Sequence, residues 1–233
     1  MACRRHKIVI IGESHVRGLS EKISSCLDDS FSVTGITKPN ADIEAITSPL
    51  HLKTDNLTKK DLIIFYGGTK EISRNETKKG LCSLKGFAQR TPNTNVILLG
   101  APYRYDLPPS SCVNTEVTLY NKRLQSLMST FNYAMVLNMS TERRHHTKHG
   151  LHLNKKGKDW VVNNLLKEIR NLYLPCKMSP PILLLWRDVN ENVTQLAEPN
   201  NGHYWSWNGL KDFGNQVLPV TVNDDTEYPE SWL

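Results

Sequence analysis

Short runs of apolar and β-branched residues recur along the first 175 positions of the chain. Three of them, residues 8–11, 62–66 and 96–99, are continuously apolar, which is typical of strands that are buried on both faces of a sheet. With two further β-branched runs they predict five β-strands, at residues 7–11, 31–36, 61–66, 95–100 and 134–139.

Between these runs, apolar residues recur every three or four positions, which is the spacing of one buried helix face. The pattern predicts helices over residues 16–27, 113–131 and 161–172, with weaker signals at 43–50 and 81–88. Strands that alternate with helices in this way form a parallel, doubly wound α/β sheet. Such sheets bind ligands at the carboxyl ends of their strands, so we expect function in the loops that follow the strands.

The alternating pattern ends at Pro175, Pro180 and Pro181. We therefore expect one domain over residues 1–175 and an acidic C-terminal tail with aromatic anchors over residues 176–233. The tail has no hydrophobic period and is expected to be loosely structured. Its apolar residues 182–186 are consistent with one added strand or with a docking segment.

Composition narrows the class of protein. Of the 233 residues, 39% are hydrophobic and 22% are charged, which excludes collagen-like, coiled-coil and wholly disordered chains. No apolar run reaches the roughly 18–20 residues of a membrane helix, and the basic start precedes too short an apolar run for a signal peptide. The five cysteines include no Cys-x-x-Cys pair, which fits a reducing compartment. We expect a cytoplasmic protein, with a nuclear location left open.

The net charge of +6 combines two parts of opposite sign. Residues 176–233 carry eight acidic and three basic side chains, a net charge of −5, and the remaining 175 residues carry +11. An excess of positive charge favours an anionic partner. No nucleic-acid-binding motif accompanies it, so nucleic acid is a candidate on charge alone and a solvated basic surface is the commoner explanation. Nothing in the sequence sets the oligomeric state.

The loop after the first predicted strand reads Gly-Glu-Ser-His and leads directly into a helix. Ser14 is therefore expected at a helix N-terminus, where free backbone N–H groups and the helix dipole favour developing negative charge. A helix-capping role for Ser14 is the simpler interpretation of this loop alone. The loop does not match a Gly-x-Ser-x-Gly nucleophile elbow, because Val16 replaces the second glycine.

A histidine-rich loop precedes the last predicted helix. His152 lies where it could reach Ser14 as a general base, and a solvated basic loop is the alternative. The spacing of His145, His146, His149 and His152 also allows a metal site. We expect no metal, because the loop lacks cysteine and the nearest carboxylates in sequence are few.

Three blocks in this order resemble those of the SGNH, or GDSL-type, hydrolase family over about residues 7–175. Residues 12–15 resemble its Gly-Asp-Ser block, residues 67–71 (Gly-Gly-Thr-Lys-Glu) its Gly-x-Asn-Asp block, and residues 149–154 its Asp-x-x-His block. The chain looks closest to the stand-alone or transposon-associated esterase domains of animal genomes. The resemblance implies a three-layer α/β/α fold around a five-stranded parallel, flavodoxin-like sheet.

The resemblance also implies roles for particular residues. Ser14 would be the nucleophile that attacks an acyl ester, and His152 would accept its proton. The oxyanion would be bound by the Ser14 N–H and by the positions that Asn40, Gly68 and Lys70 occupy here. The family is typically free of metals and cofactors and cleaves small acyl esters, lipids or acetylated sugars.

Several positions depart from the family pattern. Lys70 stands at the position of the asparagine, Asn40 at that of a glycine, His149 at that of the acid before the histidine, and Glu13 at that of the first aspartate. His149 could orient His152 only if it is neutral. Arg104, after the fourth predicted strand, fits either the substrate cleft or a structural loop cap.

Two hypotheses of different classes follow. The first is a weak serine esterase with a degenerate Ser14–His152 site that acts on a small acyl ester. The second is a catalytically inactive SGNH-like domain, a pseudoenzyme, that binds an anionic partner such as nucleic acid or lipid.

Overall fold

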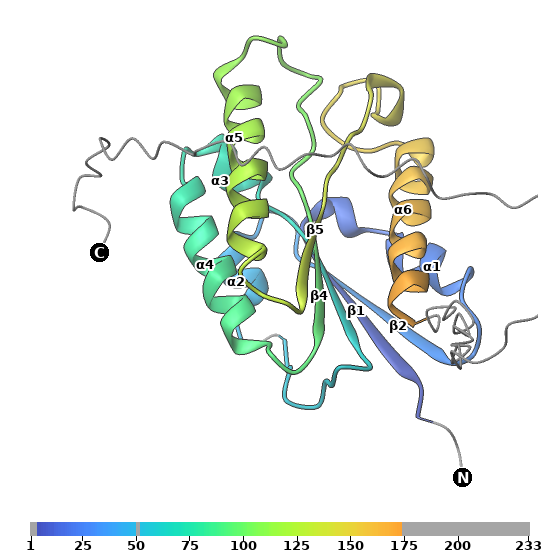
Figure 1. Ribbon diagram of the computed structural model, residues 1–233. Helices are drawn as coiled ribbons and strands as arrows, with labels where there is room; N and C mark the ends of the chain where they lie inside the picture. Colours follow the sequence, from blue (N-terminus) through green and yellow to red (C-terminus); the bar gives the residue numbers. More distant parts are fainter. Residues whose placement is uncertain (1–3, 50–51, 174–233) are drawn as a thin grey trace, which may run out of the picture. The chain divides into compact units, whose positions relative to one another are not determined.

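The computed structural model describes residues 4–49 and 52–173. Its five strands form a single parallel sheet in the order β2-β1-β3-β4-β5 (Figure 1). The strands are β1 (His6–Gly12), β2 (Phe31–Thr37), β3 (Leu62–Tyr66), β4 (Asn95–Leu99) and β5 (Ala134–Leu137). All five predicted strands and the parallel α/β class are confirmed.

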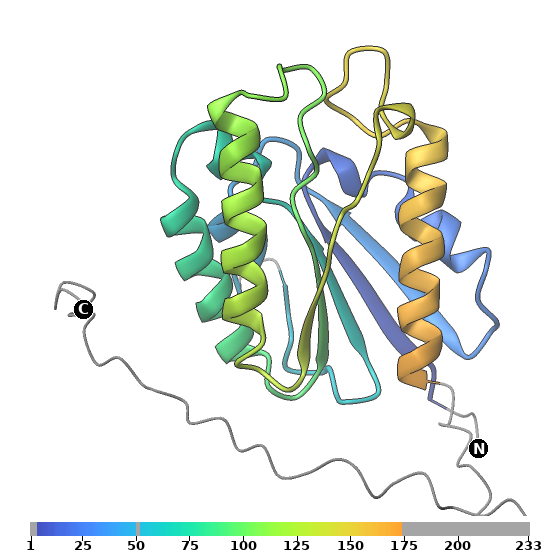
Figure 2. The same cartoon turned by 45° about the horizontal axis from the view of Figure 1, so that its top comes forward.

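Six α-helices and two short 3₁₀ turns complete this part of the chain. They are η1 (Ser14–Val16), α1 (Leu19–Ser24), α2 (Ile43–Thr47), α3 (Thr69–Ser73), α4 (Thr77–Arg90), α5 (Cys112–Met128), η2 (Arg143–His145) and α6 (Lys155–Tyr173). Helices α1 and α6 cover one face of the sheet, and α2, α4 and α5 cover the other (Figures 1 and 2). The three predicted layers are therefore present.

The continuous apolar runs are explained by this arrangement. In β3, Ile63 and Phe65 belong to the core beneath α4 and α5, whereas Leu62, Ile64 and Tyr66 belong to the core beneath α1 and α6. All five side chains are fully buried. Because both faces of a central strand are covered, each position must be apolar.

Two predicted helices are shorter in the structure than their patterns suggested. The segment predicted as one helix over residues 16–27 is divided into η1 and α1 by Gly18, whose left-handed backbone (φ +77°) cannot continue a helix. The helix predicted over residues 43–50 ends at Thr47, because Ser48 precedes Pro49 and takes an extended conformation.

Some expectations concern residues that lie outside the described part of the chain. They include the acidic tail over residues 176–233, the apolar segment 182–186 and the exact position of the boundary after residue 175. None of the helices in the described residues is long and apolar enough to cross a membrane.

The histidine-rich loop is docked against the start of α6. A short antiparallel bridge joins His146 to Leu153. The Asn154 side chain donates to the carbonyl oxygens of Arg144 (2.8 Å) and His146 (2.7 Å), and its Oδ1 accepts from the N–H of Gly157 (3.0 Å). One asparagine therefore ties the loop to the helix and fixes where the loop lies.

Close packing at Gly157 makes this docking testable. A Cβ atom at Gly157 would lie 2.1 Å from the carbonyl oxygen of His145, which is backbone and cannot rotate away. We expect Gly157→Ala to lower the free energy of unfolding by about 1–3 kcal/mol, the usual range for overpacking, in urea denaturation. Gly86→Ala is the matched control, since only the flexible end of Arg90 is near its Cβ. Equal stability of the two variants would contradict the tight docking.

Candidate active site

The loop after β1 is held between the ends of the two neighbouring strands. The N–H of Glu13 donates to the carbonyl of Tyr66 at the end of β3 (3.0 Å), and the N–H of Lys38 after β2 donates to the carbonyl of Gly12 (2.8 Å). A Cβ atom at Gly12 would lie 2.0 Å from the Tyr66 oxygen, so only glycine fits there. These contacts place half-buried Ser14, the first residue of η1, at the carboxyl edge of the sheet.

A buried carboxylate joins this loop to the loop after β3. Glu13 is 5% exposed, and its Oε1 accepts from the N–H groups of Gly68 (2.6 Å) and Thr69 (3.1 Å). The Thr69 hydroxyl donates to the other carboxylate oxygen. Gly68 has φ +109°, and a Cβ there would meet the Tyr120 hydroxyl at 2.7 Å. The Gly68 amide, predicted to take part in oxyanion or substrate binding, is thus engaged with Glu13.

Two other predicted oxyanion positions are also brought together. The Lys70 ammonium donates to the backbone carbonyl of Asn40 (2.8 Å), so the loops after β2 and β3 meet through these residues. Asn40 has φ +57°, a left-handed conformation that asparagine tolerates better than most residues other than glycine. The position that resembles a family glycine therefore has a backbone conformation that suits glycine.

Ser14 and His152 line the same cavity of about 210 Å³, although 138 positions separate them in the chain. The other lining residues are His15, Arg17, Leu153 and Lys158. The Lys158 ammonium donates to the carbonyl of Arg17 (2.8 Å), which joins the start of α6 to the loop after η1. The cavity thus contains two cationic side chains and no carboxylate.

His15 forms the buried wall of this cavity. Its ring centroid lies 5.3 Å from that of His152 and 5.3 Å from that of Tyr66. Burial, followed by the nearby charges of His152 and His146, lowers the pKa of His15 to about 3. His15 is therefore neutral near pH 7, and its buried Nδ1 has no hydrogen-bond partner within the described residues.

The other histidines of the loop are not gathered around His152. Nδ1 of His145 accepts from the N–H of Glu142 (3.0 Å), and Nε2 of His146 pairs with the Thr141 hydroxyl (3.1 Å). His149 is exposed and has no hydrogen bond or ring contact with His152 within residues 52–173. In the described part of the chain, no three His, Cys, Asp or Glu side chains are grouped as a metal site would need.

Arg104 is not among the residues that line the cavity. Its guanidinium forms a bidentate ion pair with Asp106 (2.7 and 2.6 Å), and its backbone N–H donates to Oδ1 of Asn114 (2.9 Å). These contacts hold the loop after β4 together, and both predicted roles of Arg104 stay predictions.

The same fold occurs in several lipolytic proteins of known structure. The chain is similar to a member of the lipolytic G-D-S-L family from Veillonella parvula (13% identity, TM-score 0.60, 70% of this chain and 97% of that chain). It is also similar to the lipase/acylhydrolase of Enterococcus faecalis (16%, 0.59, 71% and 96%). A third similar structure is a GDSL-like lipase from Bacteroides thetaiotaomicron (13%, 0.58, 71% and 88%).

No protein-family model matches the sequence, and neither does any curated protein. The structural likeness at this level of identity establishes the fold: residues 4–173 adopt the fold of the GDSL-type lipolytic hydrolases. The predicted SGNH fold is thus confirmed. The closer likeness to esterase domains of animal genomes or transposons stays a prediction.

Two residues that line the cavity, His15 and Arg17, were not predicted from the sequence to take part in the site. They follow Ser14 by one and three positions, so their nearness to the serine carried a signal. The anchoring role of Glu13 carried no such signal, because its partners Gly68 and Thr69 are more than fifty positions away.

A second buried carboxylate lies behind the site, on α3. Glu71 is 3% exposed. One of its oxygens accepts from the N–H of Ile43 at the start of α2 (2.6 Å), and the other has no hydrogen-bond partner within the described residues. Burial raises the pKa of Glu71, although the hydrogen bond from Ile43 opposes the change, and the charges of Glu13 and Asp42 add to the rise.

This raised pKa predicts a pH-dependent stability. Between the ordinary value of 4.5 and the raised pKa, the folded state binds more protons at Glu71 than the unfolded state. The free energy of unfolding must therefore fall as pH rises through that window. We expect Glu71→Gln, which keeps the acceptor for Ile43, to stabilise the protein above the window and to flatten the pH dependence in urea denaturation at pH 4–8. The control is Glu76→Gln at an exposed site. A Glu71→Gln protein with an unchanged pH profile would argue against a raised pKa.

Proposed function

We propose that the domain predicted over residues 1–175 is a serine hydrolase of small acyl esters, with Ser14 as nucleophile and His152 as general base. The observation that carries this proposal is the shared cavity of Ser14 and His152 at the carboxyl edge of the sheet. The fold, which is that of the GDSL-type lipolytic hydrolases, supports it.

The proposed reaction is an acyl transfer to Ser14 followed by hydrolysis. The Ser14 oxygen attacks the ester carbonyl carbon while its proton passes to His152. The tetrahedral intermediate then expels the alcohol, which takes that proton. Water attacks the acyl-serine in the same manner, with His152 again accepting and returning the proton, and releases the carboxylic acid. The net change is one ester and one water converted to one acid and one alcohol.

The oxyanion would be stabilised by fewer dedicated donors than the family pattern implies. The candidate donors are the backbone N–H groups of Ser14 and Asn40 and the Lys70 ammonium. Lys70 would have to leave the Asn40 carbonyl, to which it donates, before it could reach a substrate. Removal of one oxyanion donor typically costs about 100- to 1000-fold in turnover, so we expect a slow enzyme.

The orientation of His152 is a second reason for slow turnover. A carboxylate normally holds the catalytic histidine in the right tautomer, and removal of its charge costs about 10,000-fold in a triad enzyme. Within the described residues, no carboxylate is bonded to His152, and the ring that contacts it is the neutral ring of His15, 5.3 Å away between centroids. His149 is exposed and forms no hydrogen bond with His152, so in this arrangement it does not supply the contact that a carboxylate at its position would.

The charges of the cavity favour a particular kind of ester. Arg17 and Lys158 supply positive charge and no acidic side chain opposes it there. The cavity, at about 210 Å³, is smaller than the roughly 300–1,000 Å³ typical of sites for drug-sized ligands. Both features favour a short acyl chain on an alcohol that carries negative charge.

The same features support a second candidate function. A cationic cavity without a carboxylate beside the histidine suits an inactive domain that binds an anion such as a nucleic-acid or lipid phosphate. The two functions differ in whether Ser14 reacts, which a covalent probe measures directly.

The nucleophile is tested with a serine-reactive fluorophosphonate on the full chain. We expect the probe to label the protein, Ser14→Ala to abolish labelling, and His152→Gln to slow it by at least about 100-fold, since general-base assistance contributes about 100- to 10,000-fold. The control is Ser126→Ala, at an exposed serine of α5. Labelling that persists in Ser14→Ala, or no labelling at all, would reject the esterase in favour of the binding domain.

Restoration of the family residues is a second test. We expect Lys70→Asn combined with His149→Asp to raise the turnover of short-chain p-nitrophenyl esters by about 100-fold or more, because a missing oxyanion donor alone costs about that much. Lys122→Asn, at an exposed position of α5, controls for the lost charge. If the Lys70→Asn/His149→Asp variant turned over no faster than the Lys122→Asn control, Lys70 and His149 would not be what limits the reaction.

A further inference from the structure

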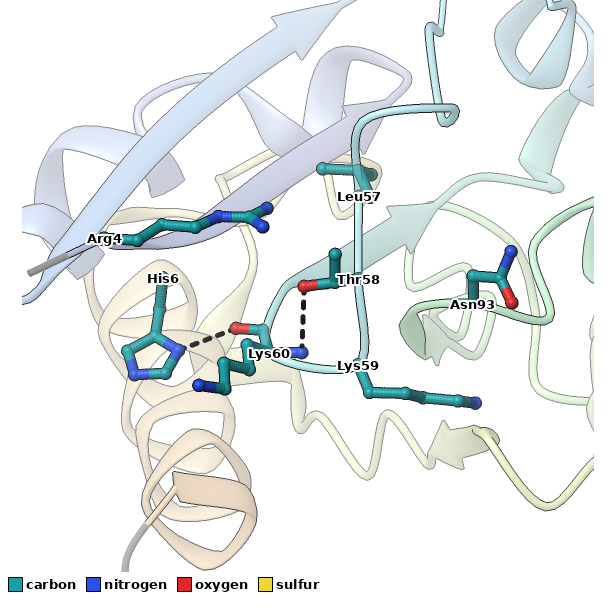
Figure 3. Close-up of a pocket in the computed structure, with 7 residues that line it drawn as sticks. All are labelled: Arg4, His6, Leu57, Thr58, Lys59, Lys60 and Asn93. Atoms are coloured by element: carbon teal, nitrogen blue, oxygen red, sulfur yellow. Dashed lines mark hydrogen bonds between the residues drawn. The ribbon is translucent and has the colours of Figure 1, made fainter.

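A larger cavity lies at the opposite edge of the sheet, where the strands begin. It has a volume of about 700 Å³ and lies beside the starts of β1 and β3 (Figure 3). Its lining residues are Arg4, His6, Leu57, Thr58, Lys59, Lys60 and Asn93. Three of these carry a permanent positive charge and none is acidic. The volume falls within the range of small-molecule sites.

The loop that forms this cavity is held by a buried carboxylate. The side chain of Asp61 is 0% exposed. Its oxygens accept from the N–H of Lys7 (2.9 Å), from the N–H and hydroxyl of Thr58 (2.8 and 3.0 Å) and from the Arg4 guanidinium (2.8 Å). The loop shape and the placement of Arg4 therefore exist before any ligand binds, which lowers the entropic cost of binding.

Backbone acceptors of the loop are engaged with the protein itself. The carbonyl of Asn56 accepts from Arg4 (3.2 Å), that of Lys59 from the side chain of Asn95 (2.7 Å), and that of Lys60 from Nδ1 of His6 (2.7 Å). In the last contact Nδ1 of His6 is the donor, because a carbonyl can only accept. What the loop offers to a ligand is consequently a set of donors and positive charges.

The two lysines extend on different sides of the loop. In Figure 3 the Lys60 side chain lies toward His6, whereas the Lys59 side chain extends to the side of Asn93. The Lys59 ammonium lies 4.6 Å from the centroid of the Tyr133 ring. Neither ammonium forms an ion pair with a carboxylate of residues 4–49 or 52–173. Two separated cations suit a ligand with two anionic groups better than one with a single charge.

We propose that this cavity is a second ligand site, which binds a small molecule that carries a diphosphate. Lys60 and Arg4 contact one phosphate, Lys59 contacts the other, and the Asn93 side-chain amide supplies a neutral hydrogen bond. The site is independent of the proposed esterase, because β1 separates it from Ser14 by seven residues, about 20 Å at the usual rise of a strand.

The test is isothermal titration calorimetry on the full chain with inorganic pyrophosphate and, separately, with ADP. We expect binding of one equivalent, weakened about tenfold or more in the double variant Lys59→Gln/Lys60→Gln, since each charge-assisted contact contributes about a tenfold factor. The matched control, Lys85→Gln/Lys122→Gln, removes the same charge from exposed positions of α4 and α5. It should bind as the unmodified protein does.

The two ligands distinguish the source of the diphosphate. Equal affinity for pyrophosphate and ADP indicates recognition of the diphosphate alone, and tighter ADP binding indicates that the cavity also holds the nucleoside; either outcome supports the site. Failure of both ligands to bind, or equal weakening in the control variant, would overturn it. The proposal would also be overturned if a single-stranded oligonucleotide bound through Lys59 and Lys60 while neither pyrophosphate nor ADP bound. Fluorophosphonate labelling should be unchanged in both double variants, so the two proposals fail separately.

Discussion

The buried Glu13 carboxylate is the interaction on which the carboxyl edge of the sheet depends. It accepts hydrogen bonds from two consecutive N–H groups after β3 and from the Thr69 hydroxyl, so the loops after β1 and β3 are fixed to each other. These strands are neighbours at the point where the strand order reverses, which is where open α/β sheets bind ligands. A carboxylate buried without such donors would be costly. The hydrogen bonds therefore stabilise the buried Glu13 carboxylate, and that carboxylate in turn fixes the positions of the loops that carry Ser14 and Lys70.

A carboxylate of the same kind organises the opposite edge. Asp61 is buried, and it fixes the loop before β3 through Thr58, Lys7 and Arg4. In both places one acidic side chain satisfies several backbone donors that the sheet itself cannot pair. The consequence differs between the edges, however. Glu13 supports a small cavity with a serine and a histidine, whereas Asp61 supports a larger one whose free groups are lysines.

The residues at the positions that depart from the resembled SGNH pattern have distinct surroundings in the folded protein. Lys70 does not simply leave a gap where an asparagine would donate; it crosses to the carbonyl of Asn40 and ties two loops together. His149, at the position of the usual acid, lies exposed, and His152 instead faces the buried and neutral ring of His15. The cavity carries positive charge from Arg17 and Lys158, and no carboxylate lines it. Any substrate or ligand there must tolerate that field.

The sequence by itself determined the strands, most of the helices and the parallel α/β class, because a strand covered on both faces must be apolar throughout and a surface helix must be apolar on one side. It also placed Ser14 and His152 in loops at one edge of the sheet. It could not show that helix 16–27 is divided at Gly18, since only the backbone conformation reveals the break. Nor could it show that His149 is exposed and does not contact His152, or that the Gly68 amide donates to Glu13. Those outcomes depend on contacts between residues far apart in the chain, and only the tertiary structure decides which side chain reaches which partner.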